Sequence, residues 1–572
     1  MHIGRFMRGV ACCAAVAAFV LTAGRENGVG AQGSTALTGV VTSQAEGKME
    51  GVLVTARRDG AKFDVTAVSD AQGKYSFPRT HLDPGTYAIK IRAVGYDLAT
   101  PGSVEVPAGK TATLNLSLEP AKDLSSQINS VEWLMSLPGT DDQKAMVQRQ
   151  ILSCTYCHSL ERIVKSKHTA EQFVDIIDRM AAYYPDGTMA GTEGRGRAKR
   201  AMTTAQAAKN PSWGVAPGVK KTDLAEYMAT ISMGRTLPAD LKMKTLPRPK
   251  GDATRVIITQ YDMPRKDTVP HDSDVDSKGN VWYTDQTDYF VGMLDAKTGE
   301  ITEWPLPKAT THEFGGASDI QLDLKDRPWF SVTSDKARNH FGIPGRFDRA
   351  TGQWQAADLP EGSSAQFMAL GPHGVIVASA LEIDPETTKL ITKFPYPEVQ
   401  RLPDAPPGQH FGYEPAMDSK GNWYITDFGS HHILKIDGQT NTASWYKTPT
   451  AFSQPRRGRM DNQDRFWFGE YVADNIAMFD AKTTKIQEWP SGIKWSSPYT
   501  SSIPDAKGRV YAPSNTSDCV FQLDPKTGKV LAYLMPTRDF DSKQVSIDPV
   551  SKKIVWMANT RNARLIKIEP LD

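Results

Sequence analysis

The chain has 572 residues, which is too long for one ordinary hydrophobic core and predicts several domains. Its 67 basic and 65 acidic residues nearly balance, without a basic stripe or an acidic tail, so nucleic acid is not an expected partner. Aromatic and β-branched residues are plentiful, which excludes a disordered chain.

Residues 1–31 have the pattern of a secretory signal peptide. Arg5 and Arg8 precede an apolar run from Val10 to Thr22, and Val29-Gly30-Ala31 is a small-residue cleavage site. The run is short for a membrane span, although an uncleaved anchor is the alternative. No later stretch is long and apolar enough to span. We therefore expect a periplasmic or secreted protein with no transmembrane segment after signal cleavage.

Residues 34–120 alternate in short β-like runs, separated by turn signals such as Asp70–Gly73. This pattern predicts a small antiparallel sandwich. Gly73–Phe77, Leu82–Tyr87 and Gly95-Tyr96 resemble the carboxypeptidase regulatory-like domain. The resemblance implies a transthyretin-like accessory module with a structural or docking role. No zinc-peptidase pattern is visible, so no peptidase site is expected.

Residues 121–237 change to helical patterns. Thr169–Gln172 reads as a capping box, and Phe173, Ile176, Ile177 and Met180 follow at the spacing of one helix face. These signals predict an α-helical domain.

The same segment contains Cys154-Thr155-Tyr156-Cys157-His158, which reads C-x-x-C-H, the attachment signature of a c-type haem. Two thiols one helical turn apart can each add to a haem vinyl group, and the adjacent histidine can reach the iron. A zinc-binding or redox C-x-x-C is the alternative. After the signal the only other cysteine is Cys519, so the chain has no disulfide framework.

The segment resembles a monohaem cytochrome c domain. The resemblance implies one covalent haem c, thioethers at Cys154 and Cys157, and His158 as the proximal iron ligand. The sixth ligand stays open among Met180, Met189, Met202, Met228, Met233 and His168, or an open or water-bound position. Met180 and Met228 fall on apolar helix faces and are expected to pack in a core. Met189 lies in less regular sequence and is the preferred distal ligand.

Residues 238–252 are rich in proline and charge and read as a linker. From residue 253 to the end, one pattern repeats around a buried strand centred on Trp282, Trp329, Ile376, Trp423, Trp467, Tyr511 and Trp556. Subtracting each of these numbers from the next gives spacings of 44–47, the length of a four-stranded propeller blade. The count predicts a seven-bladed β-propeller over residues 253–572.

The seventh unit ends after its third strand, Leu565–Ile568, and lacks a fourth. Arg255–Pro264 matches the outer strands of the other units. We expect this N-terminal piece to close the ring against the C-terminus, because closure removes exposed sheet edges.

The repeat resembles the virginiamycin B lyase (streptogramin lyase) family, with its blade core visible at Trp282–Asp285, Trp423–Asp427 and Trp467–Glu470. The resemblance implies a magnesium-dependent lyase whose active histidines lie in Pro-His motifs of the last two blades. Here those blades begin Ser497–Thr500 and Lys543–Ser546, without histidines. The lyase chemistry therefore does not carry over, and whether the chain is an enzyme stays open.

Other candidates lie where inner strands begin. His271, His312 and Glu414 are weak catalytic candidates, and Arg456-Arg457 opens another blade. Convergent histidine and carboxylate groups can bind a divalent metal such as Mg²⁺ or act as acid and base. Alternatively, they line a wet channel.

The expected fold class is multidomain and mainly β: a transthyretin-like β-sandwich, an α-helical cytochrome c domain and a seven-bladed β-propeller. We expect haem-mediated electron transfer to or from a redox partner protein or a small-molecule substrate bound at the propeller. The alternatives are a metal-dependent streptogramin lyase-like enzyme, a periplasmic oxidoreductase, or a binding protein with haem as a sensor.

Overall fold

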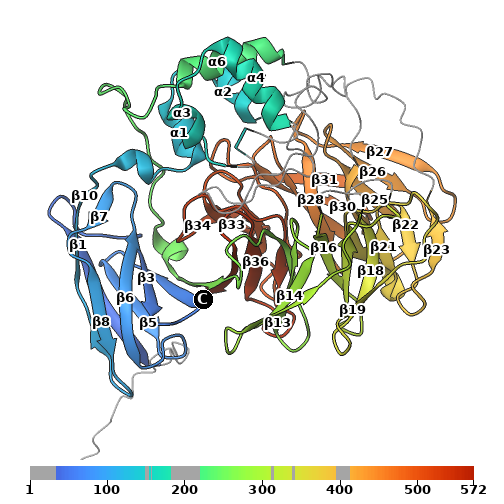
Figure 1. The fold of residues 1–572 in the computed structure, drawn as a ribbon, viewed down its shortest axis with the longest axis horizontal. Coiled ribbons are helices and arrows are strands. Elements are labelled where there is room, and N and C mark those ends of the chain that lie inside the picture. The colour runs from blue at the N-terminus through green and yellow to red at the C-terminus, as the bar shows by residue number, and fades with distance from the viewer. Residues whose placement is uncertain are drawn as a thin grey trace, which may run out of the picture.

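The computed structural model describes residues 34–148, 154–155, 158–181, 219–310, 315–337, 342–394 and 412–571. Figure 1 shows three regions: the N-terminal strands at the left, a group of helices at the top, and a large set of antiparallel sheets. Within the described ranges, no helix is long and apolar enough to cross a membrane.

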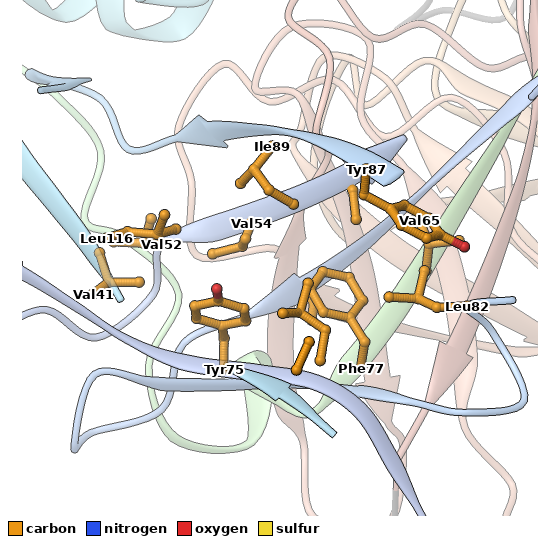
Figure 2. Close-up of a cluster of buried hydrophobic side chains, with 14 of the residues drawn as sticks. Val41, Val52, Val54, Val65, Tyr75, Phe77, Leu82, Tyr87, Ile89 and Leu116 are labelled. Carbon is orange, nitrogen blue, oxygen red and sulfur yellow. The ribbon is translucent and has the colours of Figure 1, made fainter. Parts of the chain in front are cut away.

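The N-terminal region is a sandwich of two sheets. Its strands are β1 (Thr35–Ser43), β2 (Gly47–Lys48), β3 (Leu53–Arg58), β4 (Phe63–Val68), β5 (Lys74–Pro78), β6 (Gly85–Arg92), β7 (Tyr96–Leu98), β8 (Gly102–Val106), β9 (Ala112–Thr113) and β10 (Leu116–Pro120). Alternate side chains, among them Val54, Tyr75 and Phe77, fill the space between the sheets (Figure 2). The prediction of purely antiparallel pairing is wrong, because β1 pairs in parallel with both β9 and β10.

The expected α-helical cytochrome c domain is not what the chain forms, and this part of the predicted fold class is wrong. The described part of residues 121–237 contains five short α-helices: α1 (Ser130–Ser136), α2 (Asp141–Gln148), α3 (Glu161–Val164), α4 (Ala170–Ala181) and α6 (Lys221–Ile231). They surround one small core, which also takes in Trp495 from the sheet region. Helical periodicity predicted single helices correctly but could not specify a self-contained haem-type domain.

The sheet region follows the predicted repeat. Five four-stranded sheets are described: β12 (Pro270–Val275), β13 (Asn280–Asp285), β14 (Phe290–Asp295) and β15 (Ile301–Pro305); β16 (Ala317–Leu322), β17 (Pro328–Val332), β18 (Ile343–Asp348) and β19 (Gln353–Ala356); β20 (Met368–Leu370), β21 (Ile376–Ala378), β22 (Leu381–Ile383) and β23 (Leu390–Lys393); β24 (Gly412–Met417), β25 (Trp423–Asp427), β26 (His432–Ile436) and β27 (Ala443–Lys447); β28 (Pro455–Met460), β29 (Arg465–Glu470), β30 (Asn475–Asp480) and β31 (Lys485–Pro490). A three-stranded sheet of β32 (Val510–Pro513), β33 (Cys519–Asp524) and β34 (Lys529–Leu534) comes next. The last strands are β35 (Val545–Ile547), β36 (Val555–Asn559) and β37 (Arg564–Pro570).

These sheets close into a ring, which we call the ring below. Strand β12 of the first sheet contacts β16 of the second, and also β35 and β36 at the C-terminal end of the chain. Strand β11 (Val256–Asp262) pairs antiparallel with β37 along its whole length, so the predicted closure of the N-terminal piece against the C-terminus is confirmed.

The ring does not stay separate from the sandwich, which is the second error in the predicted fold class. The other edge of β11 pairs with β4, and one eight-stranded sheet runs β35-β36-β37-β11-β4-β3-β6-β8. The free N–H and C=O groups of a buried edge strand need partners, and β4 supplies them. Where the sandwich meets the ring, Arg57 of β3 forms an ion pair of 2.6 Å with Asp262 of β11.

A repeated aspartate shapes the start of three of the sheets in the same way. Asp276, Asp323 and Asp461 each accept a hydrogen bond from a tryptophan Nε1 six residues later, at 3.3, 3.3 and 2.9 Å. The same carboxylates accept backbone N–H groups of the turn between the first two strands. One side chain therefore fixes both the turn and the buried indole, which sets the position of the inner strand.

Candidate functional site

The C-x-x-C-H motif contacts the ring through Thr155. The Arg561 guanidinium, just after β36, donates a hydrogen bond to the carbonyl of Thr155, the second residue of the motif. Thr155 Oγ1 donates to Gln148 Oε1 at 3.3 Å, and Gln148 Nε2 donates to Ser497 Oγ at 2.5 Å. Sequence-distant groups of the ring therefore hold the motif from two sides.

Other contacts fix the helices to the same part of the ring. Asn129, the N-cap of α1, donates to the Ser517 carbonyl at 2.9 Å, and its other side-chain atom accepts from Glu132 N in a capping box. Arg538 forms an ion pair with Glu161 of α3 at 2.7 Å. The helices and the last two sheets therefore form one continuous structure around the motif.

His158 is held in the tautomer that suits a metal ligand. Its Nδ1 lies 2.9 Å from the Ser159 carbonyl, which can only accept, so Nδ1 carries the proton and Nε2 keeps its lone pair. Burial lowers the pKa of His158 to about 4, which keeps the imidazole neutral near pH 7.

The remaining predicted haem residues are only partly placed. Cys154 is half-buried at the edge of the helical core. Cys157 and the preferred distal ligand Met189 lie outside the described residues. Met228 is buried in the helical core as expected, whereas Met180 is 38% exposed, so the prediction that it packs in a core is wrong.

The described residues around the motif fit a haem. Cys154 and neutral His158 supply a thiol and an imidazole beside an apolar core. Trp133 packs in that core, and its buried Nε1–H makes no hydrogen bond within the described ranges.

Two of the three catalytic candidates meet at the centre of the ring, in a group that we call the Arg457 cluster. Arg457 donates to Asp272 at 2.7 Å, to Glu414 at 2.8 Å and to Asp319 at 3.1 Å. His271 Nδ1 lies 2.9 Å from Asp272 Oδ1, and Arg459 reaches Glu414 at 2.5 Å. The third candidate, His312, lies outside the described residues.

The charges of the Arg457 cluster are matched internally. Burial opposes ionisation of Asp272, but Arg457 and His271 outweigh it and lower its pKa below the ordinary value. Burial and the neighbouring Asp272 charge raise the pKa of Asp319 well above its ordinary value. The guanidinium lies where a cation would bind between these carboxylates. Among the described side chains, no group of three or more histidine, cysteine, aspartate or glutamate residues has metal-binding geometry.

A second group, which we call the cationic cluster, consists of Arg456, Lys543 and Arg561 with Tyr499 and Asp541. The Arg456 guanidinium lies 3.8 Å from the centre of the Tyr499 ring, and Lys543 Nζ lies 4.5 Å from the same ring. Asp541 contacts Lys543 at 2.8 Å and Arg561 at 3.7 Å. The cluster therefore continues, through Arg561, to the backbone of the haem motif.

Burial lowers the pKa of Lys543 to about 7, against the attraction of Asp541, and Arg456 and Arg561 lower it further. An amine that titrates near neutral pH can give or take a proton.

Sequence reasoning named Arg456 and Arg457 but missed Asp319, Arg459 and Arg561. The repeat contained a sequence pattern that could have identified Asp319. Asp272, Asp319 and Arg457 each lie ten residues before the tryptophan of their unit, since 282 − 272, 329 − 319 and 467 − 457 are all 10. Aligning the units on their tryptophans would have brought these three residues to one level. Arg561 follows the last strand core, and no comparable pattern indicated it.

Comparisons with solved structures concern the ring. Virginiamycin B lyase from Staphylococcus aureus is 18% identical with a TM-score of 0.45, and the match covers 55% of this chain and 99% of that one. A streptogramin B lyase structure is 15% identical with a TM-score of 0.45, over 56% and 99% of the two chains. Kuenenia stuttgartiensis hydrazine synthase is 12% identical with a TM-score of 0.39, over 53% and 96%. At these scores the similarity carries no functional argument.

A search of curated proteins found no match. Residues 36–119, which make up most of the N-terminal sandwich, match the family model of the carboxypeptidase regulatory-like domain.

Proposed function

We propose that this chain is an exported haem protein. It carries one covalent haem c at Cys154, Cys157 and His158, and it transfers electrons between the haem and a redox partner or a substrate bound at the ring. The observation that supports this most is the hydrogen bond from Arg561 to Thr155, because it joins the motif directly to the buried polar centre of the ring.

The proposal rests on the five-residue motif and on the N-terminal signal pattern. It does not need a cytochrome c-type helical domain. Thioether attachment requires two thiols and a neighbouring imidazole, and the motif supplies these residue types in order.

When bound, the haem supplies one-electron redox chemistry. The residues of the chain position it. The Ser159 carbonyl orients the imidazole of His158 and leaves Nε2 as the ligand atom. Apolar side chains of the helical core, among them Trp133 and Leu160, exclude water from this side of the motif. Arg561 and Gln148 keep the motif in place on the ring.

One observation favours a second function, an oxidoreductase that oxidises or reduces a substrate at the ring. Lys543 lies in the cationic cluster with a pKa of about 7 and could act there as a general acid or base. Its cluster is joined to the motif by Arg561.

The proposal is tested by expressing the chain with its signal in a host that matures c-type haem. Wild-type protein should stain for haem on a denaturing gel and give a low-spin reduced-minus-oxidised spectrum. Cys154→Ser should weaken covalent attachment, and His158→Ala should abolish the low-spin spectrum. His373→Ala is the control, because His373 is an exposed histidine of the ring and is not a candidate iron ligand.

An unchanged spectrum in His158→Ala would remove His158 as a ligand. Wild-type protein without covalent haem, in a host that matures another c-type cytochrome in parallel, would contradict the proposal as a whole.

A further inference from the structure

The cationic cluster brings together three basic side chains from separate parts of the ring. Arg456 comes from β28, Lys543 from the segment before β35, and Arg561 from the loop after β36. Each is at most 3% exposed. Tyr499 contacts both Arg456 and Lys543, and Asp541 contacts both Lys543 and Arg561. A cluster of this kind favours anions, because guanidinium and ammonium groups only donate hydrogen bonds.

Two side-chain amides without hydrogen-bond partners in the described ranges lie beside Arg561 and Lys543. Asn515, whose backbone carbonyl accepts from Arg561 at 3.3 Å, is 0% exposed, and neither Nδ2 nor Oδ1 has a partner within the described ranges. Gln544, next to Lys543, is 2% exposed, and both atoms of its amide also lack partners there. Because nearly all buried polar groups in folded proteins are hydrogen-bonded, this concentration points to a missing ligand.

The chemistry of the surrounding groups selects a carboxylate. A guanidinium binds a carboxylate through parallel hydrogen bonds, and an amide NH₂ can add another donor. The Arg457 cluster shows the same preference a short distance away, since Arg457 holds three carboxylates of the chain itself. In the cationic cluster Asp541 is a carboxylate that Lys543 and Arg561 share.

We infer that the cationic cluster binds a carboxylate, supplied either by a free small organic acid or by a propionate of a haem attached at the neighbouring motif. The inference stands on residues of the ring and does not depend on the proposed haem. If the wild-type chain carries no haem, the free acid is the remaining source.

The test uses the full-length exported chain in two forms, wild type and the haem-free variant Cys154→Ser/Cys157→Ser. Each is titrated calorimetrically with lactate, and with lactamide as the uncharged control. The inference predicts that haem-free protein binds lactate at least tenfold more tightly than lactamide. If the wild-type chain also binds lactate, the site takes a free acid. If haem-loaded wild type does not bind it, a propionate already fills the site.

Variants assign the binding to the cluster. Arg561→Gln should weaken lactate binding at least tenfold, and Arg561→Lys should weaken it less, because lysine keeps the charge but cannot make the parallel hydrogen bonds. Lys526→Gln, an exposed lysine of the same ring, should change nothing. If Arg561→Gln does not fold, Asn515→Asp replaces it, because a carboxylate placed beside Arg561 should compete with lactate and suppress its binding.

The inference is overturned if folded haem-free protein does not bind lactate, or if it binds lactate and lactamide equally. It is also overturned if lactate binding is unchanged in both Arg561→Gln and Asn515→Asp. Absence of covalent haem from the wild type would defeat the proposed function alone and leave these outcomes intact.

Discussion

Arg456 and Arg457 are consecutive residues of β28 and equally buried, at 1% exposure, yet they belong to different environments. Arg457 is matched by three carboxylates, whereas Arg456 lies among aromatic rings, 3.8 Å from Tyr499 and 4.1 Å from Phe428. The register of β28 against β29 shifts between Pro455 and Gly458, and the two arginines in this stretch contribute to different clusters. The difference shows that burial of a charged side chain does not by itself indicate a binding site. Arg457 is matched by three carboxylates of the chain itself, whereas the amides of Asn515 and Gln544, beside the cationic cluster, have no partner within the described ranges.

We expect the largest effect from a deletion that opens the ring, because both clusters depend on the ring. Deleting residues 253–264 takes away β11, which pairs with β37 on one edge and β4 on the other. Both neighbouring strands would be left with open edges, so we expect no soluble, folded protein. Expression and a thermal melt measure this. A soluble deletion protein that melts cooperatively would show that the ring closes without β11.

Arg457→Leu is expected to be the most destabilising single substitution in the comparison. It leaves Asp272, Asp319 and Glu414 buried without their shared cation, which costs about 3–5 kcal/mol. Urea unfolding measures the loss. Arg459→Leu is the control, because Arg459 is partly exposed and contacts Glu414 alone among the carboxylates of the cluster, so its loss should be smaller. Equal losses would contradict the central role given to Arg457.

Arg456→Leu should cost less, about 1–2 kcal/mol, because it removes contacts between a cation and aromatic rings but leaves no carboxylate of the Arg457 cluster without its partner. The same unfolding experiment applies. The variant should also weaken lactate binding, which Arg457→Leu tests poorly because of its instability. A loss as large as that of Arg457→Leu would erase the distinction between the clusters.

The two clusters should respond to pH in opposite directions. Lys543 has a folded pKa near 7, below its ordinary value of 10.5, so the unfolded chain binds more protons between these values and stability rises with pH there. The pKa of Asp319 is raised, so the folded chain binds more protons, and its contribution is lost as pH rises through that raised pKa.

Each slope is at most about 1.4 kcal/mol per pH unit. Lys543→Met should flatten the rise above pH 7, and Asp319→Asn should remove the fall, in denaturation midpoints measured from pH 5 to 10. If Lys543→Met leaves the profile unchanged, the depressed pKa of Lys543 is wrong.

The sequence predicted those parts of the fold that local chemistry repeats. The regular tryptophans indicated the sheets, and the match of Arg255–Pro264 to the outer strands indicated the closing role of β11. Pairing of β4 with β11 was not predictable, because it joins residues nearly 200 positions apart through backbone groups that carry no side-chain signature. The helical segment was misread for a related reason. Periodicity indicates which face of a helix is buried, but not that Trp495 of the ring completes the core.

The candidate site likewise has a part that could be predicted from the sequence and a part that could not. The C-x-x-C-H motif is a local pattern and could be recognised directly. Asp272, Asp319 and Arg457 come together from three sheets, and only an alignment of the repeats on their tryptophans would have shown their common level. The contact of Arg561 with Thr155 spans 406 positions and depends on how the helices rest on the ring, which no pattern in the sequence encodes.

The most direct test of the central claim, that residues 154–158 carry a covalent haem held against the ring, is the intact mass of the exported wild-type chain. We predict the mass of the mature polypeptide plus one haem, and loss of that increment in Cys154→Ser/Cys157→Ser. The mass of the bare polypeptide, from cells that load haem onto another c-type cytochrome, would contradict the claim and leave the motif as a thiol or metal site.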